Sequence, residues 1–203
     1  MAEKYYNISP YAYCAGNPIK YIAPDGRKVY LSPESSDEFQ QRFKEVVRFM
    51  NEKGTSFNLA KLEESSTIYY IREGKINSFS FSSDNNDANI ITWNPYQAIM
   101  TDNDLLMSPA TTLAHELGHA ASFDKDKNTY IKRRREKDNE YDNTEEKRVI
   151  TKTEQFAAHA HGELMPYQTT RENHRGDMIN FSHSLSLDTI IKWIRNHNAS
   201  VIE

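Results

Sequence analysis

Two histidines and a glutamate have the spacing of a metal-binding helix: His115, Glu116 and His119 form the pattern His-Glu-x-x-His. On an α-helix, residues four apart lie about 40° from one line, because each residue turns the chain by roughly 100°. The two imidazoles can therefore reach one Zn²⁺ at about 2.0–2.1 Å each. Glu116 follows the first ligand directly, so its carboxylate points beside the metal, where it can accept the proton of a bound water. The pattern predicts a metal-assisted hydrolase.

The residues around this pattern favour a helix that can hold it. Ser108 predicts an N-cap, and Pro109 suits the first helical position. Leu113 and Leu117 form an apolar line toward the core. Gly118 costs about 1 kcal/mol in a helix interior, so we expect another element to pack closely against it. The alternative is a helix with surface histidines and a chance glutamate, and the agreement of cap, helix and apolar line argues against it.

The composition is that of a folded domain. The 203 residues are enough for one compact domain, or for a small domain with an attached segment. A net charge of -4 with 27% charged residues points to neither nucleic acid nor a membrane surface. Cys14 is the only cysteine, which excludes a disulfide framework and a cysteine metal site. No apolar run would span a bilayer or serve as a signal peptide, so export would need a longer chain or a dedicated apparatus.

Apolar periodicity predicts the elements before the motif. Ser35–Lys53 is expected to be an amphipathic helix that faces the core. Thr67–Ile71 and Ile76–Phe81 are expected to be strands that pair as a hairpin through the turn at Arg72–Lys75. Asn89–Trp93 is a further strand. It is interpreted either as the sheet edge that pairs with an extended substrate or as an ordinary sheet strand.

After the motif, Phe123–Lys147 is dense in charge. It is interpreted as a long solvated loop over the mouth of the site, with a substrate-binding patch as the alternative. Helical periodicity returns over Thr144–Ala160, where Asn143 can cap the helix and Phe156 lies on the expected core face. A last helix is predicted from Leu187 to Asn196, packed on the core.

A catalytic zinc ion normally has three protein ligands, so one more is needed. The candidates are Glu145, Glu146, Glu154, His159, His161, His174 and His183. Glu146 shares the expected buried face with Ile150, Thr153 and Ala157, although it could instead form a capping box with Asn143.

Four other candidates rank lower. Adjacent helical residues point about 100° apart, so Glu145 is expected at the surface if Glu146 faces the metal. Glu154 is the fallback ligand if the helix begins later. His159 and His161 are interpreted as surface histidines near a helix end.

Residues 4–27 alternate tyrosines with turn formers and resemble the closing segment of the Rhs repeat-associated core, with its Ser-Pro-Tyr-x-Tyr, Asn-Pro and Pro-Asp-Gly-Arg. The resemblance implies that residues 1–27 are a remnant of that core and that residues 28–203 are a C-terminal toxin domain. An Rhs shell, a secretion apparatus and a cognate immunity protein would then be its partners. Ala23 stands where the family usually has an aspartate associated with self-cleavage, which argues against release by that chemistry.

The stretch Thr112–Ala120 resembles the active-site helix of clostridial neurotoxin light chains. It is still more similar to type III effector zinc peptidases of enteric pathogens and their relatives at the ends of Rhs chains. In both groups the second member of a Glu-Glu pair on the next helix completes the zinc site, and Glu145-Glu146 matches that pair. The resemblance implies a gluzincin-type site with Glu146 as third ligand. Thr153-Glu154-Gln155 follows where the effectors carry Thr-Glu-Asn.

The families also carry Arg-x-x-Tyr, whose side chains stabilise the oxyanion of the tetrahedral intermediate. Arg171 and His174 stand at the matching places, with histidine instead of tyrosine. The resemblance therefore implies Arg171, together with His174, as catalytic residues beside Glu116. It covers about Ile90 to Gly176.

Together these observations predict an α+β, zincin-like fold with a small mixed sheet packed on the motif helix and further helices. The expected function is a zinc-dependent endopeptidase toxin, secreted or delivered into a target cell, where Glu116 serves as base against a protein substrate. The alternatives are a zinc hydrolase of a cell-wall or other non-protein substrate and a catalytically silent, metal-stabilised binding module.

Overall fold

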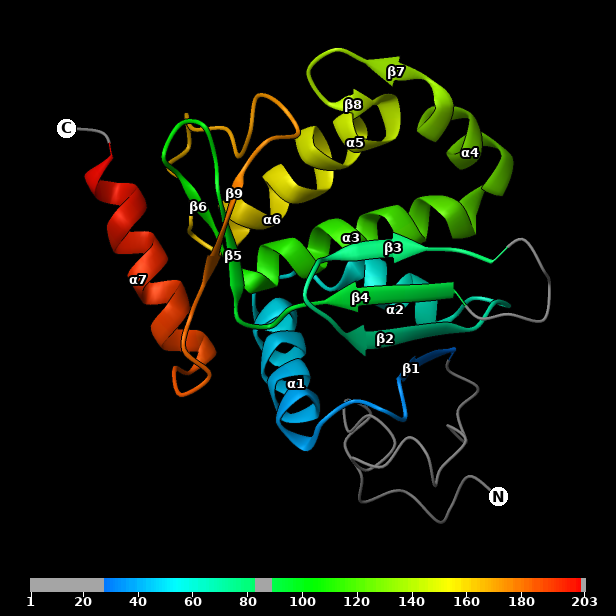
Figure 1. The fold of residues 1–203 in the computed structure, drawn as a ribbon, viewed down its shortest axis with the longest axis horizontal. Coiled ribbons are helices and arrows are strands. Elements are labelled where there is room, and N and C mark those ends of the chain that lie inside the picture. Colours follow the sequence, from blue (N-terminus) through cyan, green and yellow to red (C-terminus); the bar gives the residue numbers. More distant parts are fainter. Residues whose placement is uncertain (1–27, 83–88, 202–203) are drawn as a thin grey trace.

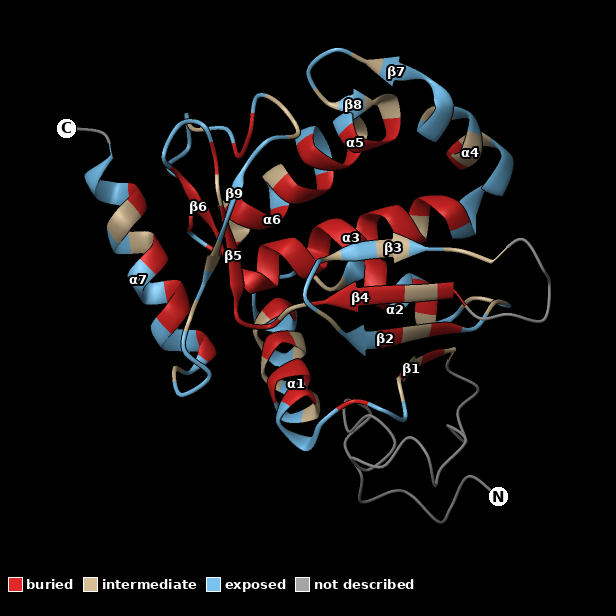
Figure 2. Ribbon diagram, viewed as in Figure 1, coloured by how far each residue is buried: buried red, intermediate tan, exposed pale blue. Residues whose placement is uncertain are grey.

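The helix that carries the motif lies at the centre of the molecule. In the computed structural model, which describes residues 28–82 and 89–201, this helix is α3, Pro109–Lys125 (Figure 1). The side chain of Ser108 accepts a hydrogen bond from the backbone N–H of Thr111, so the expected cap is confirmed. Leu113 and Leu117 are fully buried, and Figure 2 shows α3 buried along most of its length. A buried helix holds its polar side chains in fixed positions, because the core packs around them.

A four-stranded sheet packs against α3 together with two helices. Its strands lie in the order β1-β2-β4-β3. Their bounds are Val29–Leu31 for β1, Tyr69–Glu73 for β2, Asn89–Trp93 for β4 and Ser78–Ser80 for β3. The helices are α1, Asp37–Glu52, and α2, Phe57–Glu63. Phe39 of α1 packs edge-on against Trp93 of β4 at 5.7 Å between ring centroids. The helix predicted at Ser35–Lys53 is thus confirmed, and α2 was not expected.

The predicted hairpin is wrong, although both of its strands exist. β4 lies between β2 and β3, parallel to β2 and antiparallel to β3. The turn after β2 lies close to β4, not only to β3. A Cβ added at Gly74 would lie 2.2 Å from the methyl carbon of Thr92 in β4, so this position has no room for a side chain. β4 is therefore an interior strand, so the interpretation of Asn89–Trp93 as the sheet edge is also wrong. The edge beside α3 is β3, whose Phe79 packs on Phe123 of α3.

A second, three-stranded sheet lies at the N-terminal end of α3. Its order is β6-β5-β9, and its pairs are antiparallel. The bounds are Leu106–Met107 for β6, Gln97–Met100 for β5 and Asp177–Asn180 for β9. Helix α7, Leu187–Ser200, covers this sheet through Ile190 and Ile194, which confirms the predicted last helix (Figure 1).

The charge-rich stretch after α3 is helical rather than a long loop. α3 continues to Lys125, and α4 follows at Lys127–Arg135. A short hairpin of β7, Lys137–Asp138, and β8, Asp142–Asn143, leads to the next helix. Two arginines of this stretch form ion pairs with buried glutamates, Arg133 with Glu145 and Arg134 with Glu146.

A helix made of three consecutive segments, the middle one π-helical, lies beside α3. It consists of α5, Thr144–Arg148, a π-helical segment, Val149–Glu154, and α6, Gln155–Ala160. Asn143 caps it, accepting hydrogen bonds from the backbone N–H groups of Glu145 and Glu146. The predicted helix is therefore confirmed, except that Phe156 is 50% exposed. The extra residue of the π turn rotates α6 relative to α5, so the α-helical register that placed Phe156 in the core does not hold there.

The glycine of the motif helix has the close neighbour that its position in a helix predicts. A Cβ at Gly118 of α3 would lie 3.0 Å from a side-chain carbon of Thr153, so the expected close neighbour is the π-helical segment.

The described residues form a mixed α/β structure with small sheets. No helix among them is long and apolar enough to cross a membrane. Cys14 and the segment 1–27 lie outside the described residues.

Candidate metal centre

Three buried side chains from two helices converge on one point. The Nε2 atoms of His115 and His119 are 3.0 Å apart. Oε2 of Glu146 lies 3.1 Å from Nε2 of His119 and 3.3 Å from Nε2 of His115. Ligands about 2.0–2.1 Å from a tetrahedral Zn²⁺ are about 3.3 Å from one another, so the three atoms have nearly the spacing of three zinc ligands. The structure thus brings together the three residues that were predicted to hold the metal.

The π turn explains how Glu146 and Glu154 can both face α3. They are eight residues apart, which in an uninterrupted α-helix would put them about 80° apart around the axis. One additional residue in the wider turn reduces this to about 20°. Because the helix runs antiparallel to α3, Glu146 meets His119 and Glu154 meets His115, one turn away.

Glu154 contacts the opposite side of His115 from the converging nitrogens. Its Oε2 lies 2.8 Å from Nδ1 of His115, so a proton on Nδ1 leaves Nε2 free to coordinate. Arg171 pairs with both oxygens of Glu154, its Nε donating at 2.9 Å to Oε1. The fallback assignment of Glu154 as metal ligand does not match this position, because Nδ1 of His115 lies between its carboxylate and the centre.

The electrostatics of this group follow from its contacts. Burial lowers the pKa of His115, but hydrogen bonds with Glu146 and Glu154 outweigh it and raise that pKa to about 9. Burial raises the pKa of Glu154, but the positive charges of Arg171 and His115 lower it to about 2. Glu154 is therefore an anion that keeps His115 oriented.

Glu145 supports His119 from behind. It is fully buried, which corrects the expectation that it lies at the surface. Its Oε1 lies 3.5 Å from Nδ1 of His119, and Arg148 donates to both of its oxygens. Arg133 adds a contact of 3.2 Å to Oε2. The burial of Glu145 is tolerated because two arginines compensate its charge.

Glu146 is held from the solvent side as well. Arg134 donates to its Oε1 at 2.8 Å. His174, whose side chain is 39% exposed, lies 3.5 Å from Oε2 through Nε2, and its Nδ1 lies 2.6 Å from Asp142. Burial raises the pKa of Glu146, but hydrogen bonds from both motif histidines outweigh it and bring that pKa well below its usual range. Sequence reasoning missed Arg134. The available signal was the basic run Lys132–Arg135, which lies a short distance before the Glu145-Glu146 pair in the sequence.

Glu116 lies within this charged group and is only 7% exposed. Burial raises its pKa, and the charges of His115 and His119 act in the opposite direction. The charge of Arg171 acts in the same direction as the charges of the two histidines. A buried carboxylate with a raised pKa is a stronger base than a solvated one, as proton transfer from a water requires.

The two residues expected at the oxyanion lie on either side of the centre. Arg171 is 7% exposed and engaged by Glu154, with Nη2 3.5 Å from Nδ1 of His115. His174 lies on the solvent side, next to Glu146. Their role at an oxyanion stays a prediction.

The remaining histidine candidates lie elsewhere. His159 contacts Gln155 at a helix end, and His183 stacks on Tyr96. His161 is fully buried, which corrects the expectation of a surface position. Its Nδ1 lies 2.8 Å from the hydroxyl of Thr111, at the start of α3.

The same cluster contains the carboxylate of Glu163. Glu163 accepts hydrogen bonds from the backbone N–H of Ser108, at 3.1 Å, and from the hydroxyl of Thr111. A carboxylate at a helix N-terminus is stabilised by the unpaired N–H groups and the helix dipole. Glu163 therefore fixes the end of α3 that precedes the motif.

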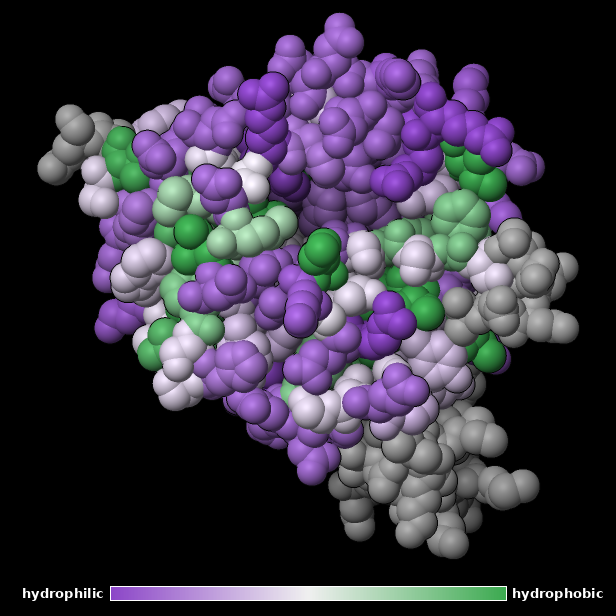
Figure 3. Space-filling view, in the orientation of Figure 1, coloured by the Kyte–Doolittle hydropathy of each residue, from purple (hydrophilic) through white to green (hydrophobic). Residues whose placement is uncertain are grey.

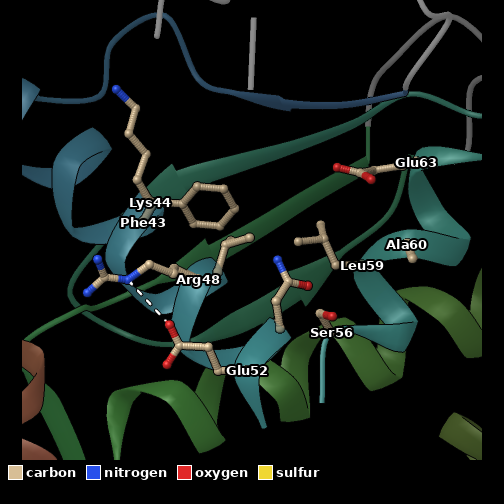
Figure 4. Close-up of a pocket in the computed structure, with 10 residues that line it drawn as sticks. Phe43, Lys44, Arg48, Glu52, Ser56, Leu59, Ala60 and Glu63 are labelled. Carbon is tan, nitrogen blue, oxygen red and sulfur yellow. Dashed lines mark ion pairs between the residues drawn. The ribbon is translucent and has the colours of Figure 1, made fainter. Parts of the chain in front are cut away.

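A separate pocket of about 310 Å³ lies between α1 and α2. Figure 4 shows Phe43 and Leu59 at this pocket and the ion pair of Arg48 with Glu52 at its rim. None of the converging residues lines it. The buried convergence of the metal-ligating atoms, rather than this pocket, therefore defines the candidate site.

The donor set fits a divalent metal of the zinc type. Two imidazole nitrogens and one carboxylate oxygen are the ligands of many catalytic zinc sites. Each histidine has a carboxylate near its other nitrogen, and the contact of Glu154 with Nδ1 of His115, at 2.8 Å, is the hydrogen bond that orients a ligating imidazole. A bound cation would replace the proton on a metal-facing nitrogen, since only neutral imidazole coordinates.

Replacing the two neighbouring glutamates should separate ligand from support. Glu146→Ala removes an oxygen from the centre, so we expect zinc affinity to fall by about 10²-fold or more. Glu145→Ala leaves all three ligand atoms in place, so we expect a smaller loss of affinity. Because it removes a buried partner of Arg148, it should lower the free energy of unfolding by about 1.5–3 kcal/mol. Chelator competition and denaturant unfolding measure the two effects. Equal zinc affinities of the two variants would contradict the assignment of Glu146.

Comparison with known proteins adds one finding. Residues 27–178 match the model of the Peptidase_M91 family, which is described as effector protein. No curated protein and no solved structure matches the chain. The match includes α3, the π turn, Arg171 and His174, and ends before α7.

Proposed function

Because the chain belongs to the Peptidase_M91 effector family, we propose that it is a zinc-dependent endopeptidase that hydrolyses a protein of the cell into which it is delivered. The family makes the chain a peptidase effector with a protein target. The single observation that carries the proposed zinc chemistry is the convergence of His115, His119 and Glu146 at ligand spacing. The position of Glu116, next to the first of these ligands on a buried helix, supports a hydrolytic rather than a structural metal.

Each residue has a defined task in this proposal. His115, His119 and Glu146 would hold the ion, which when bound activates a water and polarises the scissile carbonyl. Glu116 accepts the proton of the attacking water and passes it to the leaving amine. Glu154, held by Arg171, keeps His115 oriented so that its Nε2 faces the centre. His174 and Arg171 are the proposed donors to the oxyanion, and removal of one such donor commonly costs about 2.7–4 kcal/mol of transition-state stabilisation.

A zincin-like arrangement is part of the same proposal. A mixed sheet lies against α3, and its antiparallel edge strand β3 lies beside that helix (Figure 1). Ser78 and Ser80 of β3 are exposed. An extended peptide could add to the outer edge of β3 through backbone hydrogen bonds and so reach the centre in a fixed register.

The delivery route is proposed from the sequence of residues 1–27. Their similarity to the closing segment of the Rhs core supports a chain carried as the C-terminal toxin of an Rhs protein, with an Rhs shell, a secretion apparatus and an immunity protein as partners. Residues 28–203 would then be the toxin domain. Effector delivery into a target cell agrees with the family description.

The direct test is to identify new protein termini in a target-cell lysate. Lysate treated with zinc-loaded protein should gain a small set of new N-termini, and lysate treated with the chelated protein or with Glu116→Gln should not. A cell-wall digest treated in parallel tests the alternative substrate. Release of cell-wall fragments without new protein termini would replace the peptidase proposal by a hydrolase of another bond.

A further inference from the structure

Two consecutive arginines of α4 meet the two consecutive glutamates of α5. Arg133 contacts Glu145, and Arg134 contacts Glu146. Both contacts link exposed or half-exposed basic side chains to carboxylates that are almost completely buried. Figure 3 shows the hydrophilic surface that α4, β7, β8 and α5 form above α3. The ion pairs thus connect this surface to the candidate metal centre beneath it.

The two ion pairs are not equivalent. Glu145 is also held by Arg148, which contacts both of its oxygens. Glu146 uses its two oxygens differently: Oε2 faces His115, His119 and His174, while Oε1 pairs with Arg134. Within residues 28–82 and 89–201, no other ion pair involves Oε1 of Glu146. Among these residues, Arg134 therefore balances the side of Glu146 that faces away from the histidines.

We propose that Arg134 is a positioning residue that makes Glu146 a single-oxygen metal ligand. This inference rests on the proposed zinc function. The guanidinium holds Oε1 at 2.8 Å and so fixes the carboxylate plane with Oε2 toward the two imidazoles. Without it, Glu146 would be free to rotate about its last bond, and Oε2 would face the two imidazoles only part of the time. The site would then bind an ion less tightly, because one of its ligands would no longer be held in place.

The exposure of Arg134 makes this role testable. Its side chain is 45% exposed, whereas that of Glu146 is 7% exposed. Truncation of Arg134 therefore removes little packing, and the fold should tolerate it. Arg135 is a matched control, since it is an exposed arginine of the same helix and its replacement makes the same change in net charge.

The experiment compares Arg134→Ala, Arg134→Lys and Arg135→Ala in the full chain by chelator competition for zinc. Loss of a partner that orients a metal ligand typically weakens affinity about 10- to 100-fold, and we expect that loss in Arg134→Ala. Arg134→Lys should recover part of it, because lysine supplies the charge without the planar fork. Arg135→Ala should keep wild-type affinity. The visible absorption of the Co²⁺-substituted protein should change in Arg134→Ala and stay unchanged in Arg135→Ala.

A double-mutant cycle identifies the residue through which Arg134 acts. In a Glu146→Ala background, Arg134→Ala should cause no further loss of affinity. A loss of equal size in both backgrounds, or wild-type affinity and spectrum in Arg134→Ala, overturns the inference and leaves the zinc proposal intact. If the wild-type chain binds no zinc, or if His115→Ala binds it equally well, the proposed function fails and this inference fails with it.

Discussion

Glu116→Gln is expected to lose peptide hydrolysis by about 10²–10⁴-fold while it keeps its metal, because general-base catalysis contributes a factor of this size. Glutamine has nearly the volume of glutamate, and Glu116 is not among the three converging ligand residues. The substitution therefore removes the base but no ligand and leaves the packing of α3 unchanged. Cleavage rate with the substrate found in lysate, zinc content per chain and toxicity on expression in a susceptible cell are the three measurements.

Zinc content and cleavage activity of Glu116→Gln together distinguish the possible roles of this residue. Full zinc content with lost cleavage assigns the proton transfer to Glu116. Cleavage and toxicity at the wild-type level would exclude the peptidase mechanism and leave the metal as a structural element of a binding module. Lost zinc together with lost cleavage would instead make Glu116 part of the metal site, in conflict with the geometry.

His119→Ala and His115→Ala are expected to lose stoichiometric zinc. Structural zinc sites bind with about 10–16 kcal/mol through four ligands, so each ligand accounts for roughly 2.5–4 kcal/mol, or on the order of 10²–10³-fold in affinity. Metal analysis of the purified protein should give about one zinc per wild-type chain and much less in either variant. His159→Ala is the control, because His159 contacts Gln155 at the end of α6 and takes no part in the centre.

Thermal unfolding gives a second readout of the same loss. A ligand that binds only the folded state stabilises it by about 4 kcal/mol when present at a thousand times its dissociation constant. A chelator should therefore lower the melting temperature of the wild type and of His159→Ala, but not that of His119→Ala. If His119→Ala instead kept full zinc content and its melting temperature fell with chelator as that of the wild type does, the proposed site would be refuted.

Local interactions were predictable from the sequence. The cap of α3 by Ser108 and the apolar line of Leu113 and Leu117 depend on residues within one or two helical turns. Helix geometry likewise puts His115 and His119 on one face, since four residues make little more than a turn. The existence of α1 and α7 and the start of α7 at Leu187 followed from apolar periodicity for the same reason, although α7 ends at Ser200 rather than at the predicted Asn196.

Contacts between distant segments were not predictable in this way. The hairpin interpretation is wrong because β4, which follows β3 in the sequence, inserts between β2 and β3. The basic run Lys132–Arg135 has the pattern of a solvated loop because its ion-pair partners, Glu145 and Glu146, are buried only after α4 and α5 pack. Charge pattern alone does not show which carboxylates will lack water.

In the candidate centre, too, the contacts within one helix were predictable and those between helices were not. The sequence by itself determined that His115, Glu116 and His119 share one helix, because their relation depends only on residues per turn. It favoured Glu146 over the adjacent Glu145, since neighbouring helical residues point about 100° apart, and it kept Glu154 as the fallback if the helix began later. Only the tertiary structure placed the carboxylates of Glu146 and Glu154: packing against α3 accommodates a π turn at Val149–Glu154 that brings both to the same face. Glu146 then contacts Nε2 of both histidines, and Glu154 contacts Nδ1 of His115. Their order along α3 follows from the antiparallel direction of the two helices.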